Sequence, residues 1–78
     1  MGAFTPEPAG YTIALDYDAD NNLIYLGKAA KGTSKSSAGW SIANLVYDVN
    51  SNLIDIQWAG GNPRFDNIWD DRVSLTYS

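Results

Sequence analysis

The side chains that could carry chemistry are mostly acidic, and several of them fall in one polar stretch. Within residues 16–22, Asp16, Asp18, Asp20 and Asn22 alternate along the chain. Carboxylate and amide oxygens in such a loop are the ligands that calcium takes. The stretch nevertheless lacks the central glycine and the distal glutamate of an EF-hand loop. Because aspartate and asparagine also favour tight turns, we predict no metal site, with a calcium loop as the alternative.

Catalysis has little support in the residue types that are present. The chain contains no histidine and no cysteine, which removes the commonest general base and the strongest nucleophile. Asp70 and Asp71 form a carboxylate pair, and two carboxylates are what a glycosidase uses. Adjacent residues on an extended chain point to opposite faces, so this pair would not flank one bond. We predict that the protein is not an enzyme and uses no cofactor.

Aromatic side chains are numerous, with three tryptophans and five tyrosines in 78 residues. In a carbohydrate-binding module such rings lie exposed and stack on sugars, whereas in a small β domain they fill the core. We predict that Trp40 and Trp58 lie in the core and that Trp69 lies at a surface seam. Arg72 follows two aspartates and is predicted to form an ion pair with them that fixes the last strand.

Charge and length exclude several classes of partner. The net charge of −4 argues against nucleic acid, which requires a basic surface. No apolar run approaches the ~20 residues that span a bilayer, so no membrane contact is expected. Residues 1–10 lack the basic start and apolar centre of a signal peptide. A chain this short buries only about 60% of its unfolded surface, so without disulfides it depends on sheet packing, oligomerisation or docking onto a larger assembly.

The elements that position these residues are predicted to be strands, because apolar and polar residues alternate from Tyr11 onward. Residues 1–10 contain two prolines and are predicted to be an extended arm, which is either a floppy terminus or an arm that lies over a neighbouring subunit with Phe4 as its anchor. Residues 30–39 are predicted to be a loop, and a bulge between Ile42 and Leu45 accounts for a switch in the apolar side. The predicted strands are residues 11–17, 23–26, 40–47, 53–59 and 73–78, with a short irregular or 3₁₀ segment at 65–71.

An internal repeat organises the chain. Residues 17–24 match residues 47–54 at an offset of thirty, and both copies contain a polar turn rich in aspartate and asparagine. The repeat predicts two related hairpins, 11–29 and 40–59, within a single β domain of residues 11–78. With a C-terminal strand added, the expected fold is all-β: a small antiparallel sheet curled into a barrel or sandwich.

The chain resembles small virion-associated β proteins of tailed bacteriophages. The resemblance covers nearly all residues after the arm, and its most specific part is the ending, FDNIWDDRVSLTY at 65–77. A minor departure is Lys31-Gly32 in place of a Pro-Gly pair. The other segments that carry the resemblance are IYLGKA at 24–29, GTS at 32–34, WSI at 40–42, YD at 47–48 and WA at 58–59.

The resemblance implies a structural component of the virion, in the tail, baseplate, fibre or capsid decoration, made in the host cytoplasm. It implies no defined activity and transfers no binding residue. The expected partners are other virion proteins or further copies of the chain, and a host-surface glycan is the alternative. Partner contacts are predicted in the arm and in the closing segment, at Phe4, Phe65, Asp66, Trp69, Asp70 and Arg72.

Overall fold

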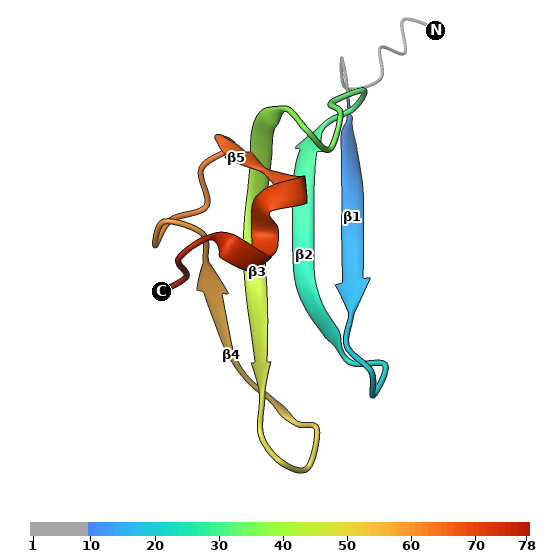
Figure 1. Ribbon diagram of the computed structural model, residues 1–78, viewed down its shortest axis with the longest axis vertical. Coiled ribbons are helices and arrows are strands. Elements are labelled where there is room, and N and C mark those ends of the chain that lie inside the picture. Colours follow the sequence, from blue (N-terminus) through green and yellow to red (C-terminus); the bar gives the residue numbers. More distant parts are fainter. Residues whose placement is uncertain (1–9) are drawn as a thin grey trace, which may run out of the picture.

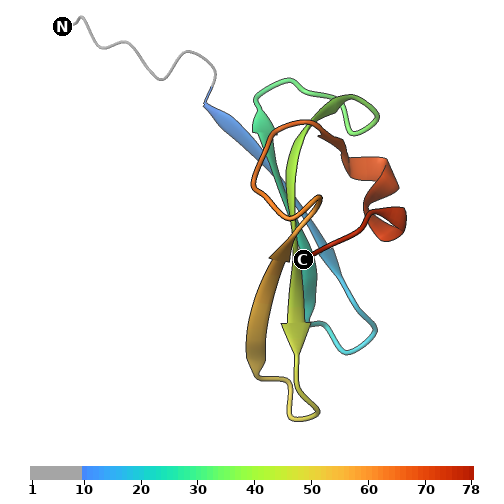
Figure 2. The same cartoon turned by 90° about the vertical axis from the view of Figure 1, so that its left-hand side faces the viewer.

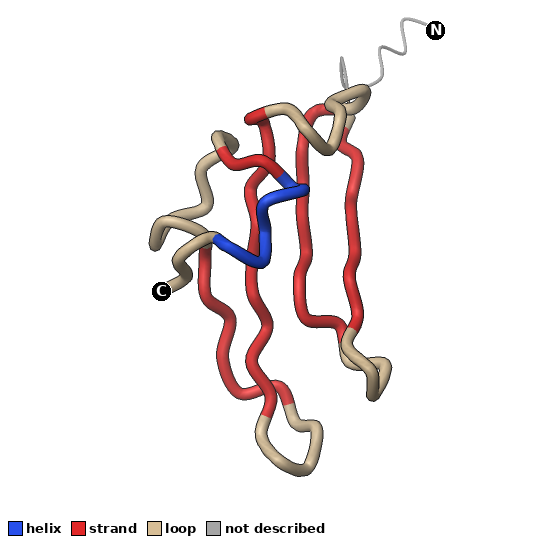
Figure 3. Tube along the Cα trace, in the orientation of Figure 1, coloured by secondary structure: helices blue, strands red, loops and turns tan. Residues whose placement is uncertain are grey.

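The computed structural model describes residues 10–78, which form an antiparallel sheet and one short helix (Figures 1 and 3). The prediction of an all-β fold is confirmed. Phe4 and the rest of the predicted arm up to residue 9 lie outside the described residues. The elements are β1 (Tyr11–Tyr17), β2 (Leu23–Ala30), β3 (Ala38–Tyr47), β4 (Leu53–Trp58), β5 (Asn67–Ile68) and the 3₁₀ helix η1 (Trp69–Ser74).

The sheet has the strand order β1-β2-β3-β4, and each strand pairs antiparallel with the next. The two repeated segments are therefore two adjacent hairpins, as predicted. The short strand β5 pairs with the beginning of β3, through Ala38 and Trp40, on the edge that β4 occupies further along. β3 is thus the central strand, with β2 on one side and both β4 and β5 on the other.

The two hairpin turns have the same hydrogen bonds. In the first turn, Asp18 Oδ1 accepts the backbone amides of Asp20 and Asn22, each at 2.9 Å. In the second turn, Asp48 Oδ1 accepts the equivalent amides of Asn50 and Asn52 at the same distance. Asn21 and Ser51 take the left-handed conformation that closes each turn, with φ of 65° and 64°. The repeated sequence therefore encodes a repeated turn.

Each hairpin contains a bulge next to its turn. The pairing passes over Ile24 in β2 and over Ile54 in β4, so the register shifts in both hairpins. The predicted bulge between Ile42 and Leu45 is wrong, because β3 pairs without a break through this region. Both faces of this central strand are apolar, and that is why the apolar side appears to switch in the sequence.

The C-terminal segment crosses one face of the sheet, and the sheet stays open (Figure 2). The prediction of a closed barrel is wrong, and no second sheet forms a sandwich within residues 10–78. The predicted terminal strand is also wrong: Val73 and Ser74 belong to η1, and Tyr77 forms only an isolated bridge with Ala59. Trp69, the first residue of η1, is buried against the sheet. The C-terminal segment therefore runs across this face of the sheet and not along one of its edges.

The core lies between this segment and the covered face of the sheet. Trp40 and Trp69 are buried with ring centroids 5.8 Å apart, and the Trp40 indole N–H donates to the Ser34 carbonyl at 2.9 Å. Gly27 lies directly beneath the two rings. The remaining buried apolar side chains of this core are small except for one, and they are Ala14, Ala29, Ile42 and Ala59. Three alanines make this a small core even for a short chain.

Tyr77 closes the C-terminal end of this layer. Its hydroxyl donates to the Arg72 carbonyl at 2.8 Å, and its ring lies 5.7 Å from that of Tyr25. Burial, with a smaller contribution from Tyr25, raises the pKa of Tyr77 from its ordinary value of 10.0 to about 12, although Arg72 acts in the opposite direction. The neutral phenol is therefore the form that the folded protein favours.

This shift predicts a loss of stability in alkali. Between pH 10 and about 12 the unfolded chain releases the Tyr77 proton while the folded chain retains it, so the free energy of unfolding falls as the pH rises. Urea unfolding across this window should show a steeper decline for the natural protein than for Tyr77→Phe. Parallel pH profiles for the two proteins would contradict the role given to Tyr77.

Candidate interaction face

Among the described residues, the face of the sheet opposite η1 is covered only at one end, where Phe65 from the loop before β5 stacks on Tyr11, and we call it the open face. Directly paired residues of neighbouring strands point to the same side, so the register identifies its members. Leu15 pairs with Leu26, Leu26 pairs with Ala43, and Ala43 pairs with Trp58 across the four strands. By alternation from these pairs, the open face comprises Tyr11, Ile13, Leu15, Tyr17, Leu26, Lys28, Ala30, Ser41, Ala43, Leu45, Tyr47, Ile56 and Trp58.

Large apolar side chains on this face are open to solvent. All four of its residues on β1, together with Ile56 on β4, expose between 48% and 60% of their surface. A half-exposed side chain of this size presents on the order of 100 Å². These five side chains thus expose roughly 500 Å² of apolar surface, which is near the upper end of the largest patch on an ordinary monomer. The half-buried Leu26, Leu45, Tyr47 and Trp58 add to it.

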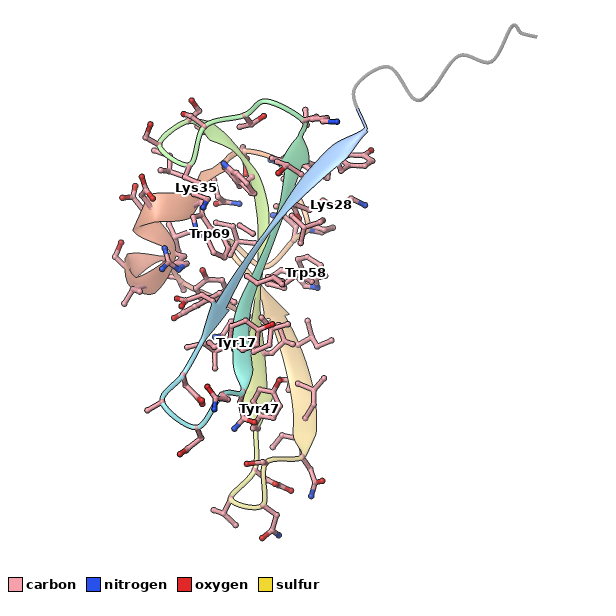
Figure 4. All side chains as sticks on the ribbon, turned by 90° about the vertical axis from the view of Figure 1, so that its right-hand side faces the viewer. Tyr17, Lys28, Lys35, Tyr47, Trp58 and Trp69 are labelled. Carbon is pink, nitrogen blue, oxygen red and sulfur yellow. The ribbon has the colours of Figure 1, made fainter. Side chains whose placement is uncertain are left out.

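The open face is almost free of charge. Lys28 is its one charged member, and its ammonium lies over the Tyr11 ring at 4.2 Å from the centroid. Figure 4 shows Lys28 and Trp58 on one side of the sheet, and Trp69 and Lys35 on the other. The acidic residues of the strands, Asp16 and Asp55, alternate to the covered side. Among the described strands, the open face therefore carries no acidic side chain.

A shallow pocket forms at one end of the open face. Tyr11, Ala30, Thr33, Gly39 and Phe65 line a cavity of about 370 Å³. The Tyr11 and Phe65 rings stack at 6.2 Å between centroids, although they come from β1 and from the loop before β5. The lining is mainly apolar, and Tyr11 and Thr33 are its residues with a side-chain hydroxyl. It fits an apolar side chain better than a charged ligand.

The structure disperses the predicted partner-contact residues. Phe65 borders the pocket and is 48% exposed, and Asp66 and Asp70 are exposed. The predicted surface position of Trp69 is wrong, because its ring is 4% exposed and inside the core. Phe4 lies outside the described residues. The closing segment thus contributes mainly to the covered layer and only Phe65 to the pocket.

Arg72 has a structural partner other than the one predicted. Its Nε donates to Asp16 Oδ2 at 2.9 Å, so the ion pair joins η1 to β1 and does not involve Asp70 or Asp71. The guanidinium also lies 4.7 Å from the centroid of the Trp69 ring. Both carboxylate and guanidinium are less than one-third exposed. Arg72 therefore fastens the helix over the core.

The tryptophans divide between the two faces. Trp40 is buried, as predicted, but Trp58 is half-buried on the open face and is not in the core. No row of three exposed indoles exists within residues 10–78, because Trp40 and Trp69 are covered. The exposed aromatic rings on or beside the open face are those of Tyr11, Tyr17 and Phe65.

In both polar turns, an aspartate carboxylate accepts hydrogen bonds from backbone amides of the same turn. Each first aspartate accepts two amides, and the hydrogen bonds at Asn52, opposed by desolvation and aided by Asn50, lower the pKa of Asp48. In the part of the chain that the structure describes, no three acidic side chains lie close enough together to hold a metal ion. The Asn22 amide instead donates to Ser51 Oγ at 3.3 Å and links the two turns.

Sequence reasoning placed Tyr11, Ile13, Leu15 and Tyr17 on one side of a strand but did not identify them as an interaction surface. The repeat held a further signal, since Tyr17 and Tyr47 are equivalent and both lie on the open face. Among the described residues no helix is long and apolar enough to cross a membrane. Comparisons of the chain with protein-family models, with curated proteins and with solved structures found no match.

Proposed function

We propose that the protein is a non-catalytic structural component of a tailed-phage particle that acts through protein–protein contacts of its open face. The single observation that supports assembly is the broad, nearly uncharged apolar surface opposite η1. Contiguous apolar surface of this extent marks an interaction site in soluble proteins. The assignment to a phage particle rests on the sequence resemblance in the closing segment.

The small core favours the same role. A domain with four alanines among its buried apolar residues gains limited stability from its own packing. Docking in a larger assembly would supply the second apolar layer that a sheet with two apolar faces requires. No strand among residues 10–78 pairs with the outer edge of β1, and this edge adds backbone groups that a neighbouring strand can bind.

Mass spectrometry of purified phage particles tests this function directly. We expect the chain in stoichiometric amounts in particles, and a Leu15→Lys variant should be incorporated at least tenfold less well because a charge then lies within the interface. Val49→Lys is the matched control, since Val49 is 99% exposed in the second turn. Absence of the natural chain from purified particles would refute the proposal.

Binding of a host-surface glycan is the second candidate function. Its support is the stacked pair of Tyr11 and Phe65, which exposes two aromatic rings beside one pocket. A glycan array probed with the natural protein and with Phe65→Ala would test it. Signal that Phe65→Ala abolishes would favour a sugar site, and a blank array would eliminate it.

A further inference from the structure

We infer that the partner of the open face is a second copy of this chain, and that two open faces pack together as the two sheets of a β-sandwich. This inference rests on the proposed assembly role and identifies the partner in that assembly as a second copy of the chain. The order of layers would be η1, sheet, sheet, η1, with the open faces forming a shared core.

Area supports a second copy. Five half-exposed side chains provide roughly 500 Å² per copy, and the half-buried members of the face raise this value. A stable interface of standard size buries about 800 Å² per partner, and homodimer interfaces are the more apolar ones. The apolar side chains of the open face thus supply more than half of the area that one partner buries in an interface of standard size.

Charge supports a second copy over a partner of different chemistry. A strongly charged partner would find little charge to match, because Lys28 is the one ionised group among the strand residues of the face. The acidic residues of the described strands, Asp16 and Asp55, lie on the covered side, away from the contact. Lys28 lies toward one end of its strand. When a twofold axis relates the two copies so that their strands run in opposite directions, the two Lys28 ammonium groups lie at opposite ends of the interface.

Shape supports the same arrangement. Stacked sheets pack about 10 Å apart with their strands rotated by about 30°, an angle that follows from the twist that both sheets share. Two copies of one sheet have the same twist by construction. Leu15, Leu45 and Ile56 lie on three different strands of the face and would interdigitate with their counterparts.

Sedimentation equilibrium of the purified full chain tests the inference. We expect twice the mass of the chain, and Leu15→Lys should weaken self-association at least about 100-fold, which corresponds to the cost of one unpaired buried charge. Val49→Lys should dimerise like the natural protein. A natural chain that remains monomeric at about 1 mM would overturn the inference. A dimer that Leu15→Lys leaves intact would also overturn it, since the contact would then use another surface.

Chemical shifts on dilution provide a readout that needs no variant. Methyl signals of Ile13, Leu15 and Ile56 should move as the dimer dissociates, while those of Val49 and Val73 should not. Movement confined to the last two would overturn the inference even if Leu15→Lys failed to fold. The chain could remain strictly monomeric and still be incorporated into particles in a way that Leu15→Lys prevents. That result would overturn the homodimer and would not contradict the proposed function.

Discussion

Trp69→Ala is expected to lower the free energy of unfolding by about 3–5 kcal/mol, because it removes a buried indole and leaves a cavity in the core. The ring is 4% exposed, packs against Trp40 and carries the Arg72 guanidinium on its face. Natural domains have only about 5–15 kcal/mol to lose. Urea unfolding followed by circular dichroism should therefore show a midpoint far below that of the natural protein.

Val73→Ala is the control for this experiment, since Val73 belongs to the same helix and is 74% exposed. Its effect should stay within about 0.5 kcal/mol. If Trp69 instead lay at a surface seam, Trp69→Ala would be as mild as the control and would weaken only the binding of a partner. Equal midpoints for the two variants would thus favour the sequence-based interpretation over the observed core.

A structural feature could be predicted from the sequence when the interactions that determine it lie between residues close together in the chain. The hairpin turns were predictable, because Asp18 and Asp48 bond only to amides within four residues. The position of Trp69 was not, because its pocket is created by Gly27 on a strand more than forty residues away. Acidic neighbours of Trp69 in the sequence suggested a surface, yet they point outward from a short helix whose buried side chain is the indole.

Only part of the open face could be predicted from the sequence. Alternation placed the apolar side chains of β1 on one side, but no pattern along a single strand states which side a helix will cover. Ala14 and not Leu15 faces η1, because only a small side chain fits beneath the two indoles and their neighbours. The apolar switch in β3 predicts a bulge from the sequence, whereas Ile42 and Leu45 lie on two different faces of one continuous strand.

Gly27→Ala should be destabilising, although its local effect alone would be the reverse. Glycine inside a strand costs about 0.5–1 kcal/mol relative to alanine, so propensity favours the substitution. A Cβ at this position would lie 2.5 Å from Trp69 Cε3, 2.6 Å from Trp69 Cζ3 and 3.0 Å from Trp40 Cε3. Overpacking of this kind costs about 1–3 kcal/mol, which exceeds the gain. The thermal midpoint should fall.

Gly39→Ala tests whether this loss comes from the rings or from the strand backbone. Gly39 lies in β3, and a Cβ there would meet chiefly the Thr33 side chain, at 3.1 Å, in a loop that can shift. We expect a change of less than about 0.5 kcal/mol for this variant. A similar fall for both glycines would show that crowding against the indoles is not what makes Gly27→Ala destabilising.

A double-mutant cycle with Trp69→Phe locates the clash. Both single substitutions are expected to destabilise, but a smaller ring gives the new methyl group room. The double variant should therefore lose less than the sum of the two, with a coupling energy of about 0.5–3 kcal/mol, as found for side chains in direct contact. If Gly27→Ala costs the same in both backgrounds, the Trp69 ring does not lie over this glycine, and the packing of η1 on the sheet is wrong. Because the ring, the helix and the Arg72–Asp16 ion pair are placed together, this one coupling tests which face of the sheet is covered and which is left open for a partner.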